Sequence, residues 1–291
     1  MTEVKELLKR VKDLEIKTKG FAEGIASGSY KSKIRGRGIE FSQVREYVFG
    51  DDTRNIDWNV TARYNKLFVK EFVEERDLFV YVIYDNSASN DFGYKKSKKD
   101  FGLEIAASLI FSAMKNNDNI GLGIFTDKLE VFVPAKKGKR HSLQLIRELL
   151  INKPKSKKTD IQASLTNFHK IIKQRSTIFI ISDFISESFT KPLKYLKNKH
   201  DVILVKLSDT TEKKFPEIGY ALVEDSETGE QVIVNTSDKD FQRQYNQFII
   251  ENDENLKRES QKLNIDMIEV TSDKPFDKVF NSFFEKRMFR R

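Results

Sequence analysis

Short apolar runs alternate with helix-like periodicity along most of this chain. Runs typical of buried strands occur at 78–84, 120–126, 129–133, 177–182, 202–207 and 265–270. Apolar positions at helical spacing predict helices at 96–116, 140–151, 160–174, 190–198, 238–262 and 276–288. Strands that alternate with helices form a mostly parallel sheet covered on both faces, so the pattern predicts a doubly wound α/β fold.

Two parts of the chain depart from this alternation. We expect residues 1–76 to form a separate N-terminal segment ahead of an α/β domain over 77–291. That segment is predicted to contain an amphipathic helix over 4–16, a loop rich in Gly, Ser and Lys over 18–38, and a strand at 67–73 that forms a hairpin with the run at 78–84. Within the α/β domain, two apolar runs in 219–235 flank turn-forming residues and predict an inserted β-hairpin.

The composition excludes thiol chemistry and a membrane span. The 291 residues include no Cys and three His, so disulfides and thiolate sites are excluded and a zinc site built on histidines is disfavoured. No run of about eighteen apolar residues occurs, and the first residues lack the apolar core of a signal peptide. We therefore expect a cytoplasmic protein.

The net charge of +8 is concentrated in one stretch. Residues 128–158 hold ten Lys or Arg and two acids, a surplus of eight that equals the excess of the whole chain. This stretch is either a solvated face or a contact for an acidic partner. A nucleic-acid partner is disfavoured, because Phe132 is the only aromatic residue available there for stacking on bases.

The strongest chemical signal follows the apolar run at 78–84. Asp85, Ser87 and Ser89 place three hard oxygen side chains on one turn, with no Cys or His nearby. Such ligands suit Mg²⁺, Mn²⁺ or Ca²⁺.

Two more oxygen ligands are predicted to lie near this turn. In the commonest doubly wound order the first and fourth strands are neighbours, and ligands bind at their carboxyl ends. The fourth strand, 177–182, leads into Asp183, and Thr159 stands just before the helix predicted from 160. In the alternative interpretation these residues only stabilise the backbone near them. Ser87, Ser89 and Thr159 would cap helices, and Asp183 would be a turn residue.

Together these five positions resemble the metal-ion-dependent adhesion site, or MIDAS, of the von Willebrand factor A domain. Its pattern is Asp-x-Ser-x-Ser, a later Thr, and an Asp after the fourth strand. The resemblance implies that the hydroxyls bind the ion directly and that one or both Asp act through water. It also implies a sixth position open to a carboxylate from a partner protein.

A narrower resemblance covers residues 36 to about 185. Gly38-Ile39-Glu40-Phe41, Arg45-Glu46-Tyr47, Gly50-Asp51-Asp52-Thr53-Arg54, Ile56-Asp57-Trp58 and Ala62-Arg63 precede the metal motif. This order is similar to that of the bacterial von Willebrand A-like family known as domain of unknown function fifty-eight, although Asn90 stands where many members carry Met. The resemblance implies a MoxR-type AAA+ ATPase as partner, an acidic protein client, and a role as adaptor or co-chaperone.

The segment 38–63 has two interpretations of its own. In the structural interpretation the charges of this segment are paired and Trp58 is a packed anchor. The segment then covers the edge of the strand at 67–73. The other is a docking surface.

For the whole protein we expect a binding module and not an enzyme. A phosphatase of the haloacid type needs a second Asp where Ser87 stands, and the motif offers no His or Glu as general base. A magnesium-dependent hydrolase at the same crevice is the alternative function.

Overall fold

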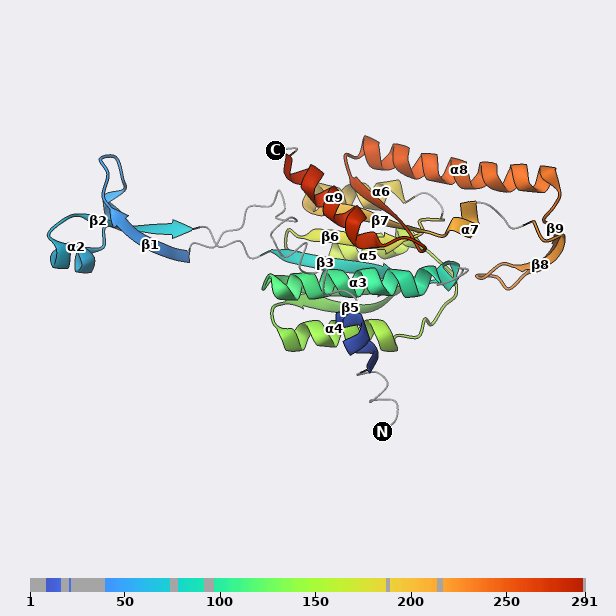
Figure 1. The fold of residues 1–291 in the computed structure, drawn as a ribbon, viewed down its shortest axis with the longest axis horizontal. Helices are drawn as coiled ribbons and strands as arrows, with labels where there is room; N and C mark the ends of the chain where they lie inside the picture. Colours follow the sequence, from blue (N-terminus) through green and yellow to red (C-terminus); the bar gives the residue numbers. More distant parts are fainter. Residues whose placement is uncertain are drawn as a thin grey trace. The chain divides into compact units, whose positions relative to one another are not determined.

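The computed structural model describes residues 9–16, 21, 40–73, 78–91, 97–186, 189–213 and 217–289 (Figure 1). Two compact units divide the chain, one formed by Lys33–Leu78 and the other by Phe79–Arg291 together with Met1–Ser32. Residues 9–16 are helical, whereas the rest of the predicted helix, 4–8, and the predicted loop apart from Phe21 lie outside the described residues. Phe21 is buried against Phe276 and Phe280 of the larger unit.

A six-stranded sheet forms the centre of the larger unit. Its strands are β3 (Phe79–Asp85), β4 (Asn119–Phe125), β5 (Leu129–Lys136), β6 (Thr177–Ser182), β7 (Asp201–Ser208) and β10 (Asp266–Thr271). They are arranged in the order β10-β7-β6-β3-β4-β5, and only β5 runs antiparallel to its neighbour. This is the predicted doubly wound order, in which the first strand of the sheet lies beside the fourth.

Helices cover both faces of this sheet. They are α3 (Lys98–Lys115), α4 (Lys139–Ile151), α5 (Ile161–Ile171), α6 (Thr190–Lys199), α7 (Thr210–Lys213), α8 (Lys239–Lys262) and α9 (Phe276–Phe289). Side chains of α5, α6 and α8 share one core layer with Ile83 and Ile180. The neighbouring strand positions point to the opposite face: Tyr84 packs close to Gly102 of α3, and Phe179 lies against Phe284 of α9.

The predicted hairpin insertion is confirmed. Strands β8 (Tyr220–Glu224) and β9 (Gln231–Asn235) pair antiparallel and lead directly into α8 (Figure 1). None of the helices in the described part of the chain is both long enough and apolar enough to cross a membrane.

The smaller unit corrects two of the predictions. Strand β2 (Phe68–Val73) pairs with β1 (Glu40–Glu46) and not with β3, because β4 and β6 occupy both edges of β3. Trp58, the first residue of α2 (Trp58–Tyr64), is 66% exposed and is not the packed anchor. That place is taken by Ile56, which is buried and bridges to Val69 on β2.

Within this unit the described part of the predicted segment, 40–63, does cover an edge of β2 through β1, as the structural interpretation predicts. Its charges are also paired: both guanidinium nitrogens of Arg45 donate to Asp51, at 2.7 and 2.8 Å. The exposure of Trp58 leaves the docking interpretation open as well.

Candidate metal centre

The carboxyl ends of β3 and β6 bring two buried acids together. Asp85 is the last residue of β3, and the parallel register aligns it with Ser182 at the end of β6. The Ser182 hydroxyl donates a 2.6 Å hydrogen bond to Asp85 Oδ2, and Asp183 follows immediately. The exposed fractions of Asp85 and Asp183 are 0% and 3%. The topology therefore brings the two predicted aspartates to adjacent strand ends, close enough for the charge of Asp183 to act on Asp85.

The turn after β3 organises the two serines. Asp85 Oδ1 accepts the Ser87 N–H at 3.0 Å, and the hydroxyl oxygens of Ser87 and Ser89 lie 3.0 Å apart. Asn90, fully buried, donates its side-chain amide to the Asp85 carbonyl at 3.2 Å and so closes the turn. Its Oδ1 has no hydrogen-bond partner among the described residues.

Thr159 stands on a loop that is bonded to this turn. The Ala88 N–H donates to the carbonyl of Lys157 at 3.1 Å, and the Asp160 N–H donates to Thr126 at 3.2 Å. The Thr159 hydroxyl donates a 2.5 Å hydrogen bond to Glu227 Oε1, on the turn of the β8–β9 hairpin.

The capping interpretation does not account for the three hydroxyls. Helix α3 is capped by Ser97, whose side chain accepts the Asp100 N–H, and α5 is capped by Asp160. Thus neither of these helices uses Ser87, Ser89 or Thr159 as its cap. Asp183 does act as a turn residue, since its Oδ1 accepts the Ile185 N–H at 3.2 Å.

A buried lysine, which the sequence reasoning missed, completes the charge pattern. The Lys98 side chain is 1% exposed, and its ammonium donates to Asp183 Oδ2 at 2.7 Å and to Glu212 Oε1 at 2.5 Å. Burial lowers the pKa of Lys98, but the two carboxylates outweigh burial and raise it above the usual range. Lys98 is therefore a charged residue that holds Asp183 in place.

The surroundings of Asp85 disfavour its charged form. Burial raises the pKa of Asp85 to about 6, and the negative charge of Asp183 contributes to the rise, although hydrogen bonds from Ser182 and Ser87 oppose it. A cation between the two aspartates would remove this penalty.

The donor set fits a hard divalent cation. Octahedral Mg²⁺ holds its ligands at about 2.1 Å, which places neighbouring ligand oxygens about 3 Å apart. The 3.0 Å separation of the Ser87 and Ser89 oxygens matches such an edge. No group of three His, Cys, Asp or Glu side chains suited to a metal occurs in the described part of the chain. A metal at this crevice would therefore depend on hydroxyls as well as carboxylates, which favours Mg²⁺ or Mn²⁺.

The backbone at the end of β6 is strained. Phe184 has a φ of +57°, a conformation that bulky L-residues rarely adopt. Two contacts hold it there: its N–H donates to the Ser182 hydroxyl at 3.0 Å, and its buried ring packs against Phe189. Strained backbone is concentrated at functional sites, because surrounding structure must hold it in place.

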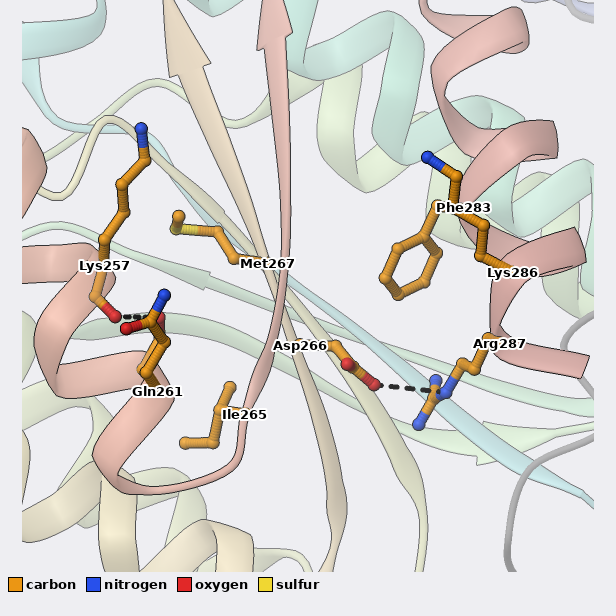
Figure 2. Close-up of a pocket in the computed structure, with 9 residues that line it drawn as sticks. Lys257, Gln261, Ile265, Asp266, Met267, Phe283, Lys286 and Arg287 are labelled. Atoms are coloured by element: carbon orange, nitrogen blue, oxygen red, sulfur yellow. Dashed lines mark hydrogen bonds and ion pairs between the residues drawn. The ribbon is translucent and has the colours of Figure 1, made fainter. Parts of the chain in front are cut away.

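A second cavity lies at the opposite end of the sheet (Figure 2). It has a volume of about 320 Å³ and is bounded by the first residues of β10 and by α8 and α9. Arg287 points across it and pairs with Asp266 at 3.2 Å and with Asp201 at 2.5 Å. Because the Arg287 guanidinium is already engaged by two carboxylates, this cavity is a weaker candidate for a site than the strand ends at Asp85.

The strand order, with its single antiparallel edge strand and the hydroxyl-rich turn at the central crevice, defines a von Willebrand A-like α/β protein. The family model described as "Protein of unknown function DUF58" matches residues 43–255, and the chain belongs to this family.

Several curated proteins are similar to this chain in sequence. Uncharacterized protein Mb1516 of Mycobacterium bovis and Uncharacterized protein Rv1480 of Mycobacterium tuberculosis are each 28% identical over 228 residues, which is 77% of this chain and 72% of each relative. Uncharacterized protein YeaD of Bacillus subtilis is 28% identical over 110 residues, 38% of this chain and 26% of that protein.

Two solved structures resemble this chain at 12% identity. The conserved hypothetical protein BatB from Bacteroides thetaiotaomicron has a TM-score of 0.45, over 74% of this chain and 100% of that chain. The von Willebrand factor type A protein from Catenulispora acidiphila has a TM-score of 0.37, over 48% of this chain and 35% of that chain.

Proposed function

We propose that this protein binds other proteins through a divalent cation, Mg²⁺ or Mn²⁺, held at the carboxyl ends of β3 and β6. The proposed ligands are those predicted from the sequence: Asp85, Ser87, Ser89, Thr159 and Asp183. The main support is the pair of buried aspartates beside two hydroxyls that are spaced as neighbouring ligands. Without a cation, one of these aspartates carries an electrostatic penalty.

Each residue has a distinct role in this proposal. Ser87, Ser89 and Thr159 supply neutral oxygens, and Asp85 and Asp183 supply the compensating charge. Both oxygens of Asp183 already accept hydrogen bonds, from Lys98 and from Ile185, which suits an aspartate that reaches the ion through water. When bound, the cation supplies an electrophilic position that a partner carboxylate can fill.

The surroundings favour an acidic partner and a binding role. Lys153, Lys155, Lys157 and Lys158 are exposed on the loop that leads to Thr159 and would accelerate encounter with acidic surfaces. The buried amine that contacts Asp183, that of Lys98, is engaged by two carboxylates and is not available as a base. Family resemblance suggests a MoxR-type AAA+ ATPase as partner, with this protein as its adaptor or co-chaperone toward an acidic client.

The test measures binding of the full chain to a MoxR-type ATPase from the same genome, in Mg²⁺ and in EDTA. We expect binding in Mg²⁺, at least tenfold weaker binding in EDTA, and the same loss in Asp85→Ala and Ser87→Ala. Asp273→Asn, an exposed carboxylate on another loop, serves as the control that should bind normally. Equal affinity in both buffers, together with an unchanged Asp85→Ala variant, would overturn the proposal.

A further inference from the structure

The turn of the β8–β9 hairpin reaches one of the proposed ligands of the metal centre. Thr159 Oγ1 donates to Glu227 Oε1 at 2.5 Å, although the two residues are 68 positions apart in the sequence. Both are half-buried, whereas every other residue of 224–230 is exposed. Glu227 is thus the one side chain of this turn that the rest of the domain covers.

Hydrogen bonds within the turn leave the Glu227 carboxylate available for contacts outside it. Asp225 Oδ1 accepts the N–H groups of Glu227 and Thr228, at 2.8 and 3.0 Å. The Asp225 carbonyl accepts the Gly229 N–H at 2.7 Å, and Gly229 has a φ of +76°. Asp225 therefore stabilises the turn, and Glu227 projects from it.

The contact between Thr159 and Glu227 is a hydrogen bond of 2.5 Å, shorter than the separation of two ligands on one ion, so a bound cation would lengthen it. Ligand oxygens on one octahedral Mg²⁺ lie about 3 Å apart. A hydroxyl can donate its proton to a carboxylate while a lone pair faces a cation. Glu227 is therefore close enough to Thr159 that a cation bound to the Thr159 hydroxyl could also take the Glu227 carboxylate as a ligand.

We propose that Glu227 is an intramolecular ligand of the metal centre, and that the partner is a protein with an acidic turn that displaces it. This inference rests on the metal-dependent binding proposed above. Glu227 would hold the sixth position until a carboxylate presented in the same way replaces it.

The hairpin is suited to displacement because little packing holds it. Tyr220, Leu222, Val232 and Ile233 are 81%, 61%, 52% and 71% exposed, so moving the hairpin away would uncover little apolar surface. The exposed Lys157 and Lys158 beside Thr159 attract the acidic turn of the hairpin and would attract an acidic turn of a partner in the same way.

The test uses Mn²⁺ as the probe on the full chain. Free Mn²⁺ is measured by electron paramagnetic resonance, and the water bound to the ion by proton relaxation enhancement. Glu227→Gln should bind Mn²⁺ about tenfold more weakly than the wild type, and its bound ion should carry one additional exchangeable water. Glu230→Gln, an exposed carboxylate of the same turn, is the matched control and should behave as the wild type.

A competition arm tests the sixth position directly. Acetate in excess should displace the additional water in Glu227→Gln and should have little effect on the relaxation enhancement of the wild type. If Glu227→Gln matches the wild type in affinity, water content and acetate response while Asp85→Ala has lost Mn²⁺ binding, the metal centre stands and the role of Glu227 is wrong. If the wild type shows no saturable Mn²⁺ binding, the proposed function fails and this inference fails with it.

Discussion

Replacement of Asp85 by Asn should stabilise the metal-free protein at neutral pH. Burial and the charge of Asp183 raise the pKa of Asp85 from 3.8 to about 6. Below pH 3.8 the carboxyl is protonated in both states and adds nothing to stability. Between pH 3.8 and 6 the unfolded state loses the proton while the folded state keeps it, so stability falls as the pH rises. Above pH 6 the carboxyl is ionised in both states, and the folded state is destabilised by the full free energy that corresponds to the pKa difference.

The magnitude follows from the size of this shift. About two pKa units correspond to about 3 kcal/mol of folding free energy. Asn is neutral at every pH, has nearly the same shape, and can still accept the Ser87 N–H. In EDTA at pH 7.5 we therefore expect Asp85→Asn to unfold with a free energy higher by about 1–3 kcal/mol, with the difference vanishing near pH 4.

The assay is urea unfolding in EDTA across pH 4 to 7.5, with Asp273→Asn as an exposed control for the loss of one negative charge. Addition of Mg²⁺ should stabilise the wild type by mass action and should not stabilise Asp85→Asn. A variant that is less stable than the wild type in EDTA at pH 7.5, or a difference that does not change with pH, would refute the reasoning.

Three further changes test other parts of the structure. Lys98→Met leaves two buried carboxylates without their cation and should cost about 3–5 kcal/mol in urea unfolding. Burial, aided by nearby positive charges, lowers the pKa of His200 to about 4, so stability should fall as the pH drops from 6.5 toward 4; His200→Asn should lose part of this slope between pH 7 and 5. Trp58→Ala should cost less than about 0.5 kcal/mol, whereas Ile56→Ala should cost about 2 kcal/mol or more, as read from amide hydrogen exchange over 40–73.

The α/β part of the fold could be predicted because its strands are buried on both faces. Residues such as Val82, Ile83 and Ile180 are fully buried, so the strands form continuous apolar runs that the sequence makes visible. The doubly wound strand order then predicts that Asp85 and Asp183 lie at adjacent strand ends. Most of the candidate site follows from these two rules together.

The smaller unit could not be predicted in the same way. Strand β1 has the sequence EFSQVRE and contains no continuous apolar run, so its pairing with β2 leaves no local signal. The exposure of Trp58 is likewise decided by tertiary packing, because Ile56, two residues earlier, is the residue that bridges to β2 and is buried. The residue types alone therefore do not show which of the two apolar side chains, Ile56 or Trp58, is buried.

Lys98 and Glu227 were missed for a related reason. Each is a charged residue in a polar stretch, where solvation is the usual outcome. Lys98 contacts Asp183 and Glu212, which are 85 and 114 positions away in the sequence. Glu227 contacts Thr159, which is 68 positions away. Only the assembled fold brings these groups together.

The formal charges of the crevice explain why a ligand carboxylate there would be exchangeable. Asp85, Asp183 and Glu212 carry three negative charges when ionised, and Lys98 carries one positive charge, so a divalent cation would make the centre neutral. A carboxylate added by Glu227 or by a partner would then leave one net negative charge, which only solvent-exposed lysines can offset. Coordination would fix the geometry of that carboxylate, but electrostatics would not bind it tightly. Such a balance suits a site whose partners must come and go, and below pH 6 it requires that the proton of Asp85 leave when the cation enters.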